Sequence, residues 1–261
     1  MNILDEIVEN KRKEIEAAKR LRSPADLKRA AQKARIAPRG FRKALAKGRG
    51  PVAVIAELKK KSPSRGVLAP HFRPEEIALK FNENGASALS VLTDEKYFGG
   101  KLEYLQSVRK AVPLPLLRKD FIVDEYQVYE SLLAGADAVL LIAAVLSGDE
   151  MARLKTAAES LGLDALLEVH TESDMRKVKG LGEAMVGINN RDLTTFEVSL
   201  EVTAKLMRFV SKGQFVVSES GIRTHQDLLA LKKLGVGAVL VGESLITEKD
   251  PGAALKRLLG K

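Results

Sequence analysis

Short apolar runs alternate with amphipathic stretches along most of the chain. In three segments a glycine follows a helix-like stretch and leads into an apolar run: NGASALSVLT (84–93), AGADAVLLIA (134–143) and LGVGAVLVGE (234–243). Glycine is typical of the left-handed residue that ends a helix before a strand. The three glycines are 50 and then 100 residues apart. A βα unit of about 25 residues divides both intervals, so the pattern predicts a series of such units.

Five further apolar runs fill the remaining positions of this series: 52–58, 115–119, 164–169, 185–189 and 214–218. Amphipathic stretches such as 124–135 and 224–235 separate them. Near-continuous apolar strands alternating with helices indicate a parallel sheet covered by helices. Eight units at this length predict a closed (β/α)8 TIM barrel of eight parallel strands. An open doubly wound sheet is disfavoured, because no G-x-G-x-x-G follows the first strand.

Residues 1–50 precede the first predicted strand. Their apolar residues recur at helical spacing and predict an amphipathic helix: Ile3, Leu4, Ile7, Val8 and Ile15. We therefore expect two parts, an N-terminal helical extension packed on the barrel (1–50) and a (β/α)8 barrel catalytic domain (51–261).

The net charge of +9 lies entirely in that first part of the chain. Residues 1–50 contain 15 basic and 6 acidic side chains, whereas the remainder contains 28 of each. A solvated helix face, an arm that attracts an anionic ligand or lipid, and a nucleic-acid-binding segment all fit this excess. Few aromatic residues are interleaved with the charges, which disfavours base stacking. We therefore expect no nucleic-acid partner.

Cysteine and histidine usage restrict the chemistry further. The chain contains no cysteine, which excludes disulfides and thiolate chemistry and is compatible with a cytoplasmic location. His71, His170 and His225 form no H-x-x-x-H or H-E-x-x-H motif, so we expect no metal site. His170 is expected to face away from Glu168. No apolar run approaches the ~20 residues that span a bilayer, so we expect no membrane partner.

Polar residues follow the predicted strands at the ends where barrel enzymes carry their chemistry. Side chains at i and i+2 of a strand share a face, so these residues are expected to meet at one opening. They are Glu57 and Lys59, Lys119, Glu168, Asn189 and Arg191, and Ser218 and Ser220. Buried charges are costly unless they are paired or used. The convergence therefore predicts an acid–base site, with a lysine as proton donor and a glutamate as proton carrier.

Small residues at the ends of the last two strands predict a phosphate site. Glycine lets backbone N–H groups approach an anion, and a helix N-terminus adds a favourable field. The candidate residues are Ser220, Gly221, Gly242, Glu243 and Ser244, and tight turns without a ligand are the alternative. The stretch SPSRG (62–66) is either a rigid turn or, as we favour, a mobile lid over a phosphate-bearing substrate.

Over essentially its whole length the chain resembles indole-3-glycerol phosphate synthases. The motifs that carry the resemblance are IAELKKKSPSRG (55–66), LSVLTDEKYFGG (89–100), LLRKDFIVDEYQVYESLLAGADAVLLI (116–142), LLEVHTESD (166–174), GINNRDLTTFEV (187–198) and SESGI (218–222). The resemblance implies a barrel enzyme of tryptophan biosynthesis without a cofactor. Its substrate would be 1-(2-carboxyphenylamino)-1-deoxyribulose 5-phosphate, which closes to indole-3-glycerol phosphate with loss of CO2 and water.

The resemblance also implies catalytic roles. Lys119 would be the general acid that protonates the carbonyl oxygen as the aryl carbon attacks it. Lys59 would hold the carboxylate or phosphate end of the substrate and assist dehydration. Glu57 and Glu168 would stabilise cationic intermediates and move protons, with Glu57 as the base in dehydration. Asn189 would orient the substrate hydroxyl and the neighbouring glutamates.

Binding roles follow from the same resemblance. Arg191 would support the anionic ring substituent, and Ser62 would help at the carboxylate. Four residues would bind the phosphate: Ser220, Gly221, Gly242 and Ser244. The N-terminal extension would lie over the barrel mouth, which would place a basic arm beside a doubly anionic substrate. We expect a cytoplasmic monomer whose partner is this small phosphorylated molecule.

Two alternatives remain open from the residues alone. Another phosphosugar barrel, such as phosphoribosylanthranilate isomerase or a tryptophan synthase α-type lyase, would need one acid–base pair. Such an enzyme would leave the four charges of Glu57, Lys59, Lys119 and Glu168 in excess. A catalytically silent barrel that binds nucleic acid or a partner through residues 1–50 is the second alternative, and steep salt dependence of RNA binding would support it.

Overall fold

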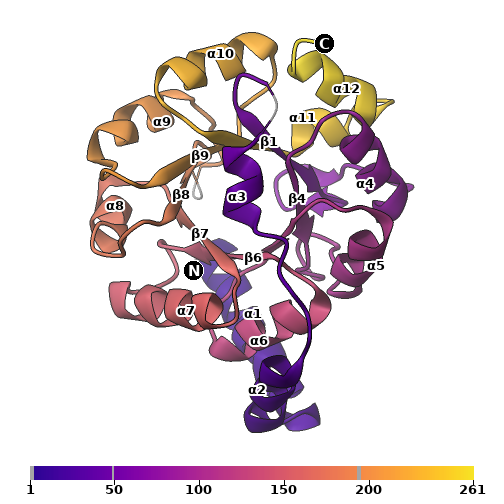
Figure 1. The fold of residues 1–261 in the computed structure, drawn as a ribbon, viewed down its shortest axis with the longest axis vertical. Coiled ribbons are helices and arrows are strands. Elements are labelled where there is room, and N and C mark those ends of the chain that lie inside the picture. Colours follow the sequence, from indigo (N-terminus) through magenta and orange to yellow (C-terminus); the bar gives the residue numbers. More distant parts are fainter. Residues whose placement is uncertain (1–2, 49, 193–194) are drawn as a thin grey trace.

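Eight parallel strands close into a barrel in the computed structural model, which describes residues 3–48, 50–192 and 195–261 (Figure 1). Their order around the barrel is β1-β10-β9-β8-β7-β6-β5-β4. The strands are β1 (Ala53–Leu58), β4 (Ala88–Leu92), β5 (Leu116–Lys119), β6 (Ala138–Ile142), β7 (Asp164–Val169), β8 (Met185–Asn189), β9 (Phe215–Glu219) and β10 (Ala238–Val241). The predicted TIM barrel is confirmed. Seven of the eight predicted apolar runs contain one of these strands, and the run 214–218 covers all of β9 except Glu219.

Helices between successive strands and after the last strand cover the outside of the barrel (Figure 1). They are α4 (Pro74–Glu83), α5 (Glu103–Ala111), α6 (Glu125–Ala134), α7 (Gly148–Ser160), α8 (Glu172–Val178), α9 (Glu201–Leu206) with the 3₁₀ helix η1 (Met207–Phe209), α10 (His225–Lys233), α11 (Glu243–Ile246) and α12 (Pro251–Leu258). The amphipathic stretches 124–135 and 224–235 form α6 and α10. Gly135 ends α6 with a φ of 88°, the left-handed conformation predicted for it.

Strand residues alternate between two apolar cores because successive side chains point to opposite faces. In β1, Val54, Ala56 and Leu58 pack outward in the core beneath the helices, whereas Ala53 and Ile55 face the barrel interior. Other strands supply matching interior residues: Leu117, Leu140, Leu166, Val217 and Leu240. This layering fills the lower barrel with apolar side chains and leaves its carboxyl end for polar ones.

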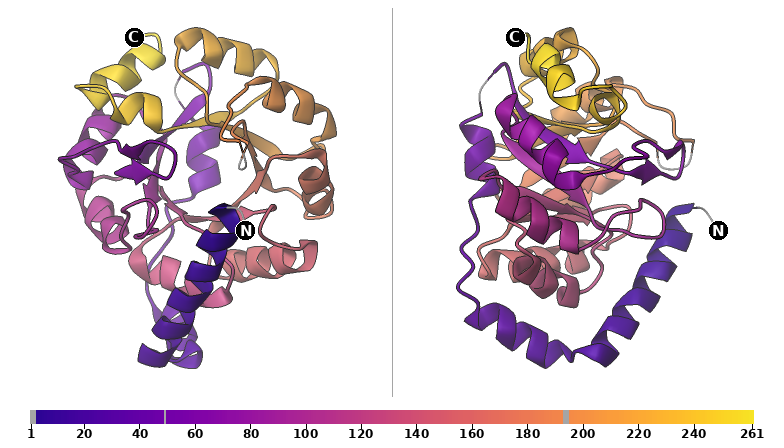
Figure 2. Two further views of the ribbon diagram at one scale, coloured as in Figure 1. Left: turned by 180° about the vertical axis from the view of Figure 1, so that it is seen from behind. Right: turned by 90° about the vertical axis from the view of Figure 1, so that its right-hand side faces the viewer.

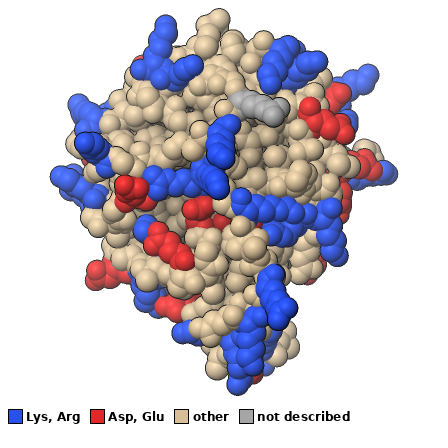
Figure 3. Space-filling view, viewed as in Figure 1, with Lys and Arg blue, Asp and Glu red and all other residues tan. Residues whose placement is uncertain are grey.

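The N-terminal extension runs from one end of the barrel to the other (Figure 2). It contains α1 (Ile3–Leu21), α2 (Pro24–Lys33) and α3 (Phe41–Ala46). Phe41 and Leu45 of α3 are buried in the interior core, so this helix closes the barrel floor. Lys and Arg side chains gather at the projecting end of the molecule, where Figure 1 shows α2 (Figure 3). Among the described residues, no helix is both long and apolar enough to cross a membrane.

A buried ion-pair network attaches α1 to the barrel. Lys11 Nζ lies 3.0 Å from Asp94 Oδ2 and 3.1 Å from Asp120 Oδ1, and the Lys11 side chain is only 6% exposed. Asp120 also accepts hydrogen bonds from Arg118 and Thr93. Burial alone would raise the pKa of Asp120, but Arg118 and Lys11 outweigh it and lower this pKa to about 2. Asp120 directly follows β5, so the network fixes α1 beside the carboxyl end of the barrel.

Candidate active site

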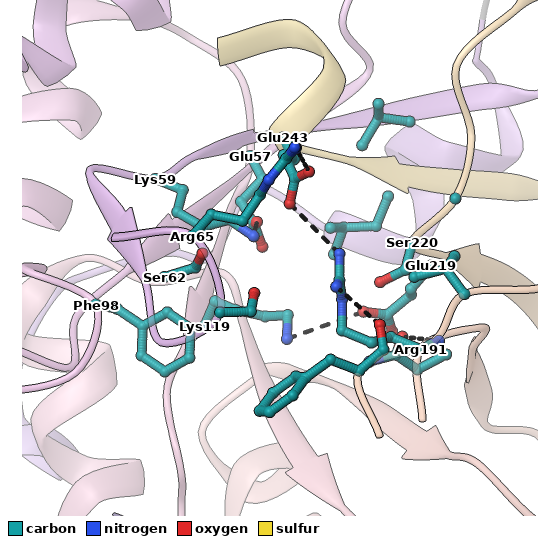
Figure 4. A pocket seen from close by; sticks show the side chains of 18 of the residues that line it. Glu57, Lys59, Ser62, Arg65, Phe98, Lys119, Arg191, Glu219, Ser220 and Glu243 are labelled. Atoms are coloured by element: carbon teal, nitrogen blue, oxygen red, sulfur yellow. Dashed lines mark hydrogen bonds and ion pairs between the residues drawn. The ribbon is translucent and has the colours of Figure 1, made fainter. Parts of the chain in front are cut away.

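A cavity of about 480 Å³ opens at the carboxyl ends of the strands, a volume that suits a small-molecule ligand (Figure 4). All twelve candidate residues line it: Glu57, Lys59, Ser62, Lys119, Glu168, Asn189, Arg191, Ser220, Gly221, Gly242, Glu243 and Ser244. Eleven of them come from the carboxyl ends of β1, β5, β7, β8, β9 and β10, and Ser62 comes from the short strand β2 (Lys61–Ser62). Tertiary structure therefore brings together residues that are up to 187 positions apart in the sequence.

The strand period explains why charges occupy this cavity. Each charged residue follows an interior apolar residue at i+2 on the same face: Glu57 after Ile55, Lys119 after Leu117, Glu168 after Leu166 and Glu219 after Val217. The same backbone alternation that fills the interior core therefore delivers these side chains to the cavity. Their carboxylates and ammonium group are buried together rather than dispersed in solvent.

Lys119 lies between two carboxyl groups. Its Nζ donates to Glu168 Oε2 at 3.1 Å and lies 3.9 Å from Glu219 Oε2. Burial alone would lower the pKa of Lys119, but Glu168, Glu219 and Glu57 outweigh it and raise this pKa above its ordinary value. Lys119 is therefore a cation at neutral pH, with a proton to donate into the cavity.

The two carboxyl groups beside Lys119 have pKa values that are shifted in opposite directions. Burial alone would raise the pKa of Glu168, but Lys119 and His170 outweigh it and lower this pKa. Burial and repulsion from Glu168 raise the pKa of Glu219 well above its ordinary value. Glu168 is thus the ionised member of the pair and Glu219 the one that retains a proton. Two neighbouring carboxyl groups whose pKa values are shifted apart can serve as a base and an acid.

Glu219 is a site residue that the sequence reasoning missed. In the motif SESG, Ser218 and Ser220 were predicted to face the barrel mouth. Within β9, however, Glu219 points to the cavity and Ser218 points to the opposite face of the strand. Ser218 is buried outside the barrel, 2.8 Å from Thr203 Oγ1, so its predicted place at the mouth is wrong. Strand alternation counted from Val217 would have found Glu219. Gly187 makes room for it, because a Cβ there would lie 2.2 Å from Glu219 Oε1.

Glu57 and Lys59 form a second ion pair in the cavity. Lys59 Nζ lies 2.7 Å from Glu57 Oε1, and Glu57 is buried. The i, i+2 spacing at the end of β1 places both side chains on the cavity side, as predicted (Figure 4). Gly242 leaves the space that Glu57 occupies, because a Cβ on this glycine would lie 2.5 Å from Glu57 Oε1.

Asn189 and Arg191 line the wall next to Glu168. The Asn189 side-chain oxygen accepts the backbone N–H of Arg191 at 3.1 Å. A hydrogen bond from the Asn189 side chain to Glu168 contributes to the lowered pKa of that carboxyl. Arg191 Nη1 donates to the Phe196 carbonyl at 3.3 Å, and its Nη2 donates to Glu243 at 3.4 Å. The motif 187–198 also includes residues 193–194, which lie outside the described residues.

The chain bends sharply at the predicted phosphate site. Ser220 and Gly221 both have positive φ values, 64° and 83°, directly after β9. A Cβ on Gly221 would lie 2.7 Å from Val198 Cγ1, so the bend requires glycine there. The Ser244 hydroxyl donates to the Ile222 carbonyl at 2.8 Å, which ties the turn after β10 to the turn after β9.

The SPSRG stretch crosses the mouth of the cavity. It connects β2 (Lys61–Ser62) and β3 (Gly66–Val67), which pair as a short antiparallel hairpin. Arg65 at the turn reaches Glu243 at 2.5 Å, and Arg191 approaches the other oxygen of the same carboxylate (Figure 4). Glu243 therefore presents its side chain to two arginines, which leaves its backbone as the part that can face an anion. The hydroxyl of Ser62 is buried with no hydrogen-bond partner among the described residues.

The extension contributes apolar rather than basic residues to the cavity. Ile3, Leu4 and Ile7 of α1 line it, together with Phe98 and Phe121. The expected position of the extension at the mouth is therefore correct, but the expected basic arm beside the substrate is wrong among the described residues. Among the basic side chains of α1, Lys11 and Lys19 pair with acidic residues on the barrel. This wall suits an aromatic ring better than an anion.

His170 also departs from its predicted orientation. Its Nε2 lies 3.4 Å from Glu168 Oε1, although the sequence interpretation had it facing away. The two residues are separated by two positions, so the strand period places them on one side. Within the described residues, no group of three or more His, Asp or Glu side chains is arranged to hold a metal ion.

A family model for indole-3-glycerol phosphate synthase matches residues 4–258. The chain belongs to the indole-3-glycerol phosphate synthase family. It is 48% identical over 260 residues to the indole-3-glycerol phosphate synthase of Albidiferax ferrireducens, with 98% of each chain covered. It is 48% identical over 249 residues to that of Desulforamulus reducens, covering 95% of this chain and 93% of the other. As a member of the indole-3-glycerol phosphate synthase family, the chain is a carboxy-lyase of tryptophan biosynthesis, and the isomerase alternative is not favoured.

Solved structures with much lower identity share the fold. A 3-hexulose-6-phosphate synthase from Salmonella typhimurium matches with a TM-score of 0.62 and 14% identity, over 80% of this chain and 97% of that one. A chain of the tryptophan synthase complex from Pyrococcus furiosus matches with a TM-score of 0.60 and 14% identity, over 82% of this chain and all of the other. These likenesses concern the barrel architecture that indole-3-glycerol phosphate synthases share with other enzymes.

Proposed function

We propose that the cavity residues divide the ring closure of the family between two acid–base groups. Lys119, Glu168 and Glu219 form one group, and Glu57 with Lys59 forms the other. The observation that carries this proposal is the position of Lys119 Nζ, which lines the cavity and lies 3.1 Å from Glu168 Oε2. Each group contains a cation that can donate a proton and a carboxylate that can accept one.

Lys119 acts in the condensation. The aryl carbon that bears the carboxylate attacks the ketone carbon and forms the new C–C bond, while Lys119 gives its proton to the carbonyl oxygen. The attack leaves a cationic ring, which the ionised Glu168 stabilises across a short distance. Loss of CO2 returns the electron pair of its C–C bond to the ring and removes that positive charge. The Asn189 side chain orients the Glu168 carboxylate and the hydroxyl group formed in this step.

Lys59 and Glu57 act in the dehydration. The hydroxyl formed in the first step leaves as water after it receives a proton from Lys59. Glu57 takes the proton from the adjacent carbon, so that the double bond of the indole forms. The 2.7 Å separation of these two side chains supports this pairing, because the proton can return from Glu57 to Lys59 between turnovers.

The two ends of the substrate occupy opposite sides of the cavity. The phosphate lies at the turns after β9 and β10, bound by Ser220, Gly221, Gly242 and Ser244, with the backbone N–H of Glu243. The positive φ at Ser220 and Gly221 supports this, since such turns aim N–H groups at anions. The aromatic ring packs against Phe98, Phe121 and α1. Arg191 and the unpartnered hydroxyl of Ser62 approach the ring carboxylate.

Indole fluorescence tests these roles directly. Purified protein is mixed with 1-(2-carboxyphenylamino)-1-deoxyribulose 5-phosphate, and the rise in fluorescence reports product. Lys119→Ala should lower kcat by roughly 10²–10⁴-fold, the usual effect of losing a general acid, while the protein remains folded. Lys110→Ala, an exposed lysine on α5, is the matched control and should keep the full rate. If Lys119→Ala kept most of its rate, the assignment of the acid would be wrong.

We also propose that the chain works as a monomer, with residues 1–50 as an integral extension of the 51–261 barrel. The large apolar side chains exposed among the described residues come from six separate segments: Leu21, Val67, Leu79, Val198, Phe209 and Leu234. Light scattering should give the mass of one chain. Phe41 and Leu45 plug the barrel floor, so a 51–261 fragment should fail to fold, and a stable fragment would contradict the integral role.

We place this enzyme in the cytoplasm, where phosphorylated biosynthetic intermediates are made. The absence of cysteine is compatible with a reducing compartment. Cell fractionation should recover the enzyme with cytoplasmic markers, and recovery elsewhere would contradict this location.

A further inference from the structure

The two oxygens of Glu168 face different partners. Oε2 accepts a hydrogen bond from Lys119 at 3.1 Å, whereas Oε1 lies 3.4 Å from His170 Nε2. The His170 side chain is 9% exposed and does not line the cavity. The imidazole therefore contacts the Glu168 oxygen that Lys119 does not contact.

The backbone around His170 is fixed by the start of α8. Thr171 is the N-cap of this helix, and Asp174 completes the capping box. The Asp174 carboxylate also accepts the backbone N–H of His170 at 3.1 Å. The helix cap therefore fixes the backbone position from which the His170 side chain starts. From this position the ring nitrogen Nε2 lies 3.4 Å from Glu168 Oε1.

The imidazole has no hydrogen-bond partner among the described residues. Neither Nδ1 nor Nε2 makes a hydrogen bond there, although both atoms are buried. Buried polar atoms are nearly always paired, because leaving one unpaired costs free energy. A valine or leucine would fill the same space without this cost. A ring kept at such a cost beside the ionised carboxylate of the site points to a role in that site.

We propose that His170 is a positioning residue, which fixes Glu168 Oε1 so that Oε2 faces Lys119 and the substrate. The proposal rests on the proposed role of Glu168 in the condensation. Contacts at both oxygens restrict rotation of the carboxylate about its terminal bond, so its charge stays where the cationic ring forms. His170 itself does not reach the substrate.

The groups that face Glu168 decide its protonation. Lys119 from β5 and His170 after β7 favour the ionised form, and so does the amide of Asn189 from β8. Glu219 from β9 holds the proton of this pair, because burial and the charge of Glu168 raise the pKa of Glu219. Burial works against the charge of Glu168, and the lowered pKa of Glu168 shows that the favourable contacts dominate. Removing His170 should therefore raise the pKa of Glu168.

The test compares His170→Asn with His170→Ala by steady-state kinetics across pH. Asn occupies part of the ring volume and carries no titratable group. Both variants should lower kcat by about 10-fold, less than the loss of a group that itself transfers a proton, with KM within about twofold. The acidic limb of the pH profile should move to higher pH. His71→Asn, which removes an exposed imidazole, should leave rate and profile unchanged.

A double mutant separates this inference from the proposed function. In a Glu168→Gln background, His170→Asn should cause no further loss, because its effect passes through Glu168. If Glu168→Gln alone kept the full rate, the proposed role of Glu168 would fail. If Glu168→Gln were inactive while His170→Asn kept the wild-type rate and profile, only the positioning role would be overturned. A loss in His170→Asn that follows the melting temperature with no movement of the acidic limb would also overturn it.

Discussion

Half-buried Lys119 and buried Glu168 form an ion pair across strands that are not neighbours. Lys119 ends β5 and Glu168 belongs to β7, with β6 between them, yet Nζ and Oε2 are 3.1 Å apart. Only the inward curvature of a closed barrel allows side chains from alternate strands to meet in this way. A buried ion pair contributes little net stability, because desolvation offsets its attraction. Its value here is chemical, since each partner keeps the other charged.

The opposed pKa shifts of Glu168 and Glu219 predict unequal effects of the same substitution. Glutamine resembles a protonated glutamate in shape and charge. Glu219→Gln should therefore keep the rate within about 10-fold, whereas Glu168→Gln should lower kcat by roughly 10²-fold or more. Steady-state kinetics with indole fluorescence measures both. A larger loss of kcat in Glu219→Gln than in Glu168→Gln would mean that Glu168, and not Glu219, retains the proton.

Gly187 should tolerate no side chain. A Cβ at this position would lie 2.2 Å from Glu219 Oε1, so Gly187→Ala must displace the carboxyl group that lies beside Lys119. We expect kcat to fall by at least about 10-fold, since small misplacements in active sites cost rate. Gly180→Ala is the matched control, because nothing lies within 4 Å of its added Cβ. Equal rates for the two variants would mean that the space over Gly187 is not needed.

Lys11 should stabilise the fold far more than its neighbour Lys13. Lys11→Met would leave the buried carboxylates of Asp94 and Asp120 without this cation, and we expect the free energy of unfolding to fall by about 3 kcal/mol. Lys13 on the same helix is 72% exposed and pairs only with Glu9 among the described residues. Lys13→Met should change stability by less than about 0.5 kcal/mol. Urea unfolding distinguishes the two, and a similar small change in both would show that α1 is held by its apolar face.

The Arg65–Glu243 contact should act as a weak latch on the hairpin that crosses the cavity mouth. Arg65 is 58% exposed, so the pair contributes less than about 1 kcal/mol and can open readily. Arg65→Ala should raise KM several-fold, because a loosened hairpin closes less well over the substrate. Kinetics should be measured at 50 mM and 500 mM salt. The KM values of the wild type and Arg65→Ala should converge at high salt, because salt screens the Arg65–Glu243 pair. Arg73→Ala, an exposed arginine that pairs with Glu76 on its own helix, is the control. If Arg65→Ala and Arg73→Ala gave the same KM at low salt, the hairpin would close without this pair.

Local patterning determined the architecture and most of the site. Each apolar run became a strand because its alternation fits one interior and one exterior core, and the glycines before the runs ended helices. The i, i+2 rule placed Glu57 and Lys59 together, and all twelve candidate residues line the cavity. Such predictions succeed because period and turn chemistry depend only on neighbouring residues.

Tertiary structure decided which face of each strand end looks inward and which distant residues meet there. A shift of one residue in β9 exchanges Ser218 for Glu219 at the mouth, and sequence interpretation chose the wrong one. The His170 contact with Glu168, the opposed pKa shifts and the apolar lining from α1 likewise needed the folded chain. The physical reason is that burial and electrostatic interactions depend on distances between segments, and the barrel closure sets those distances.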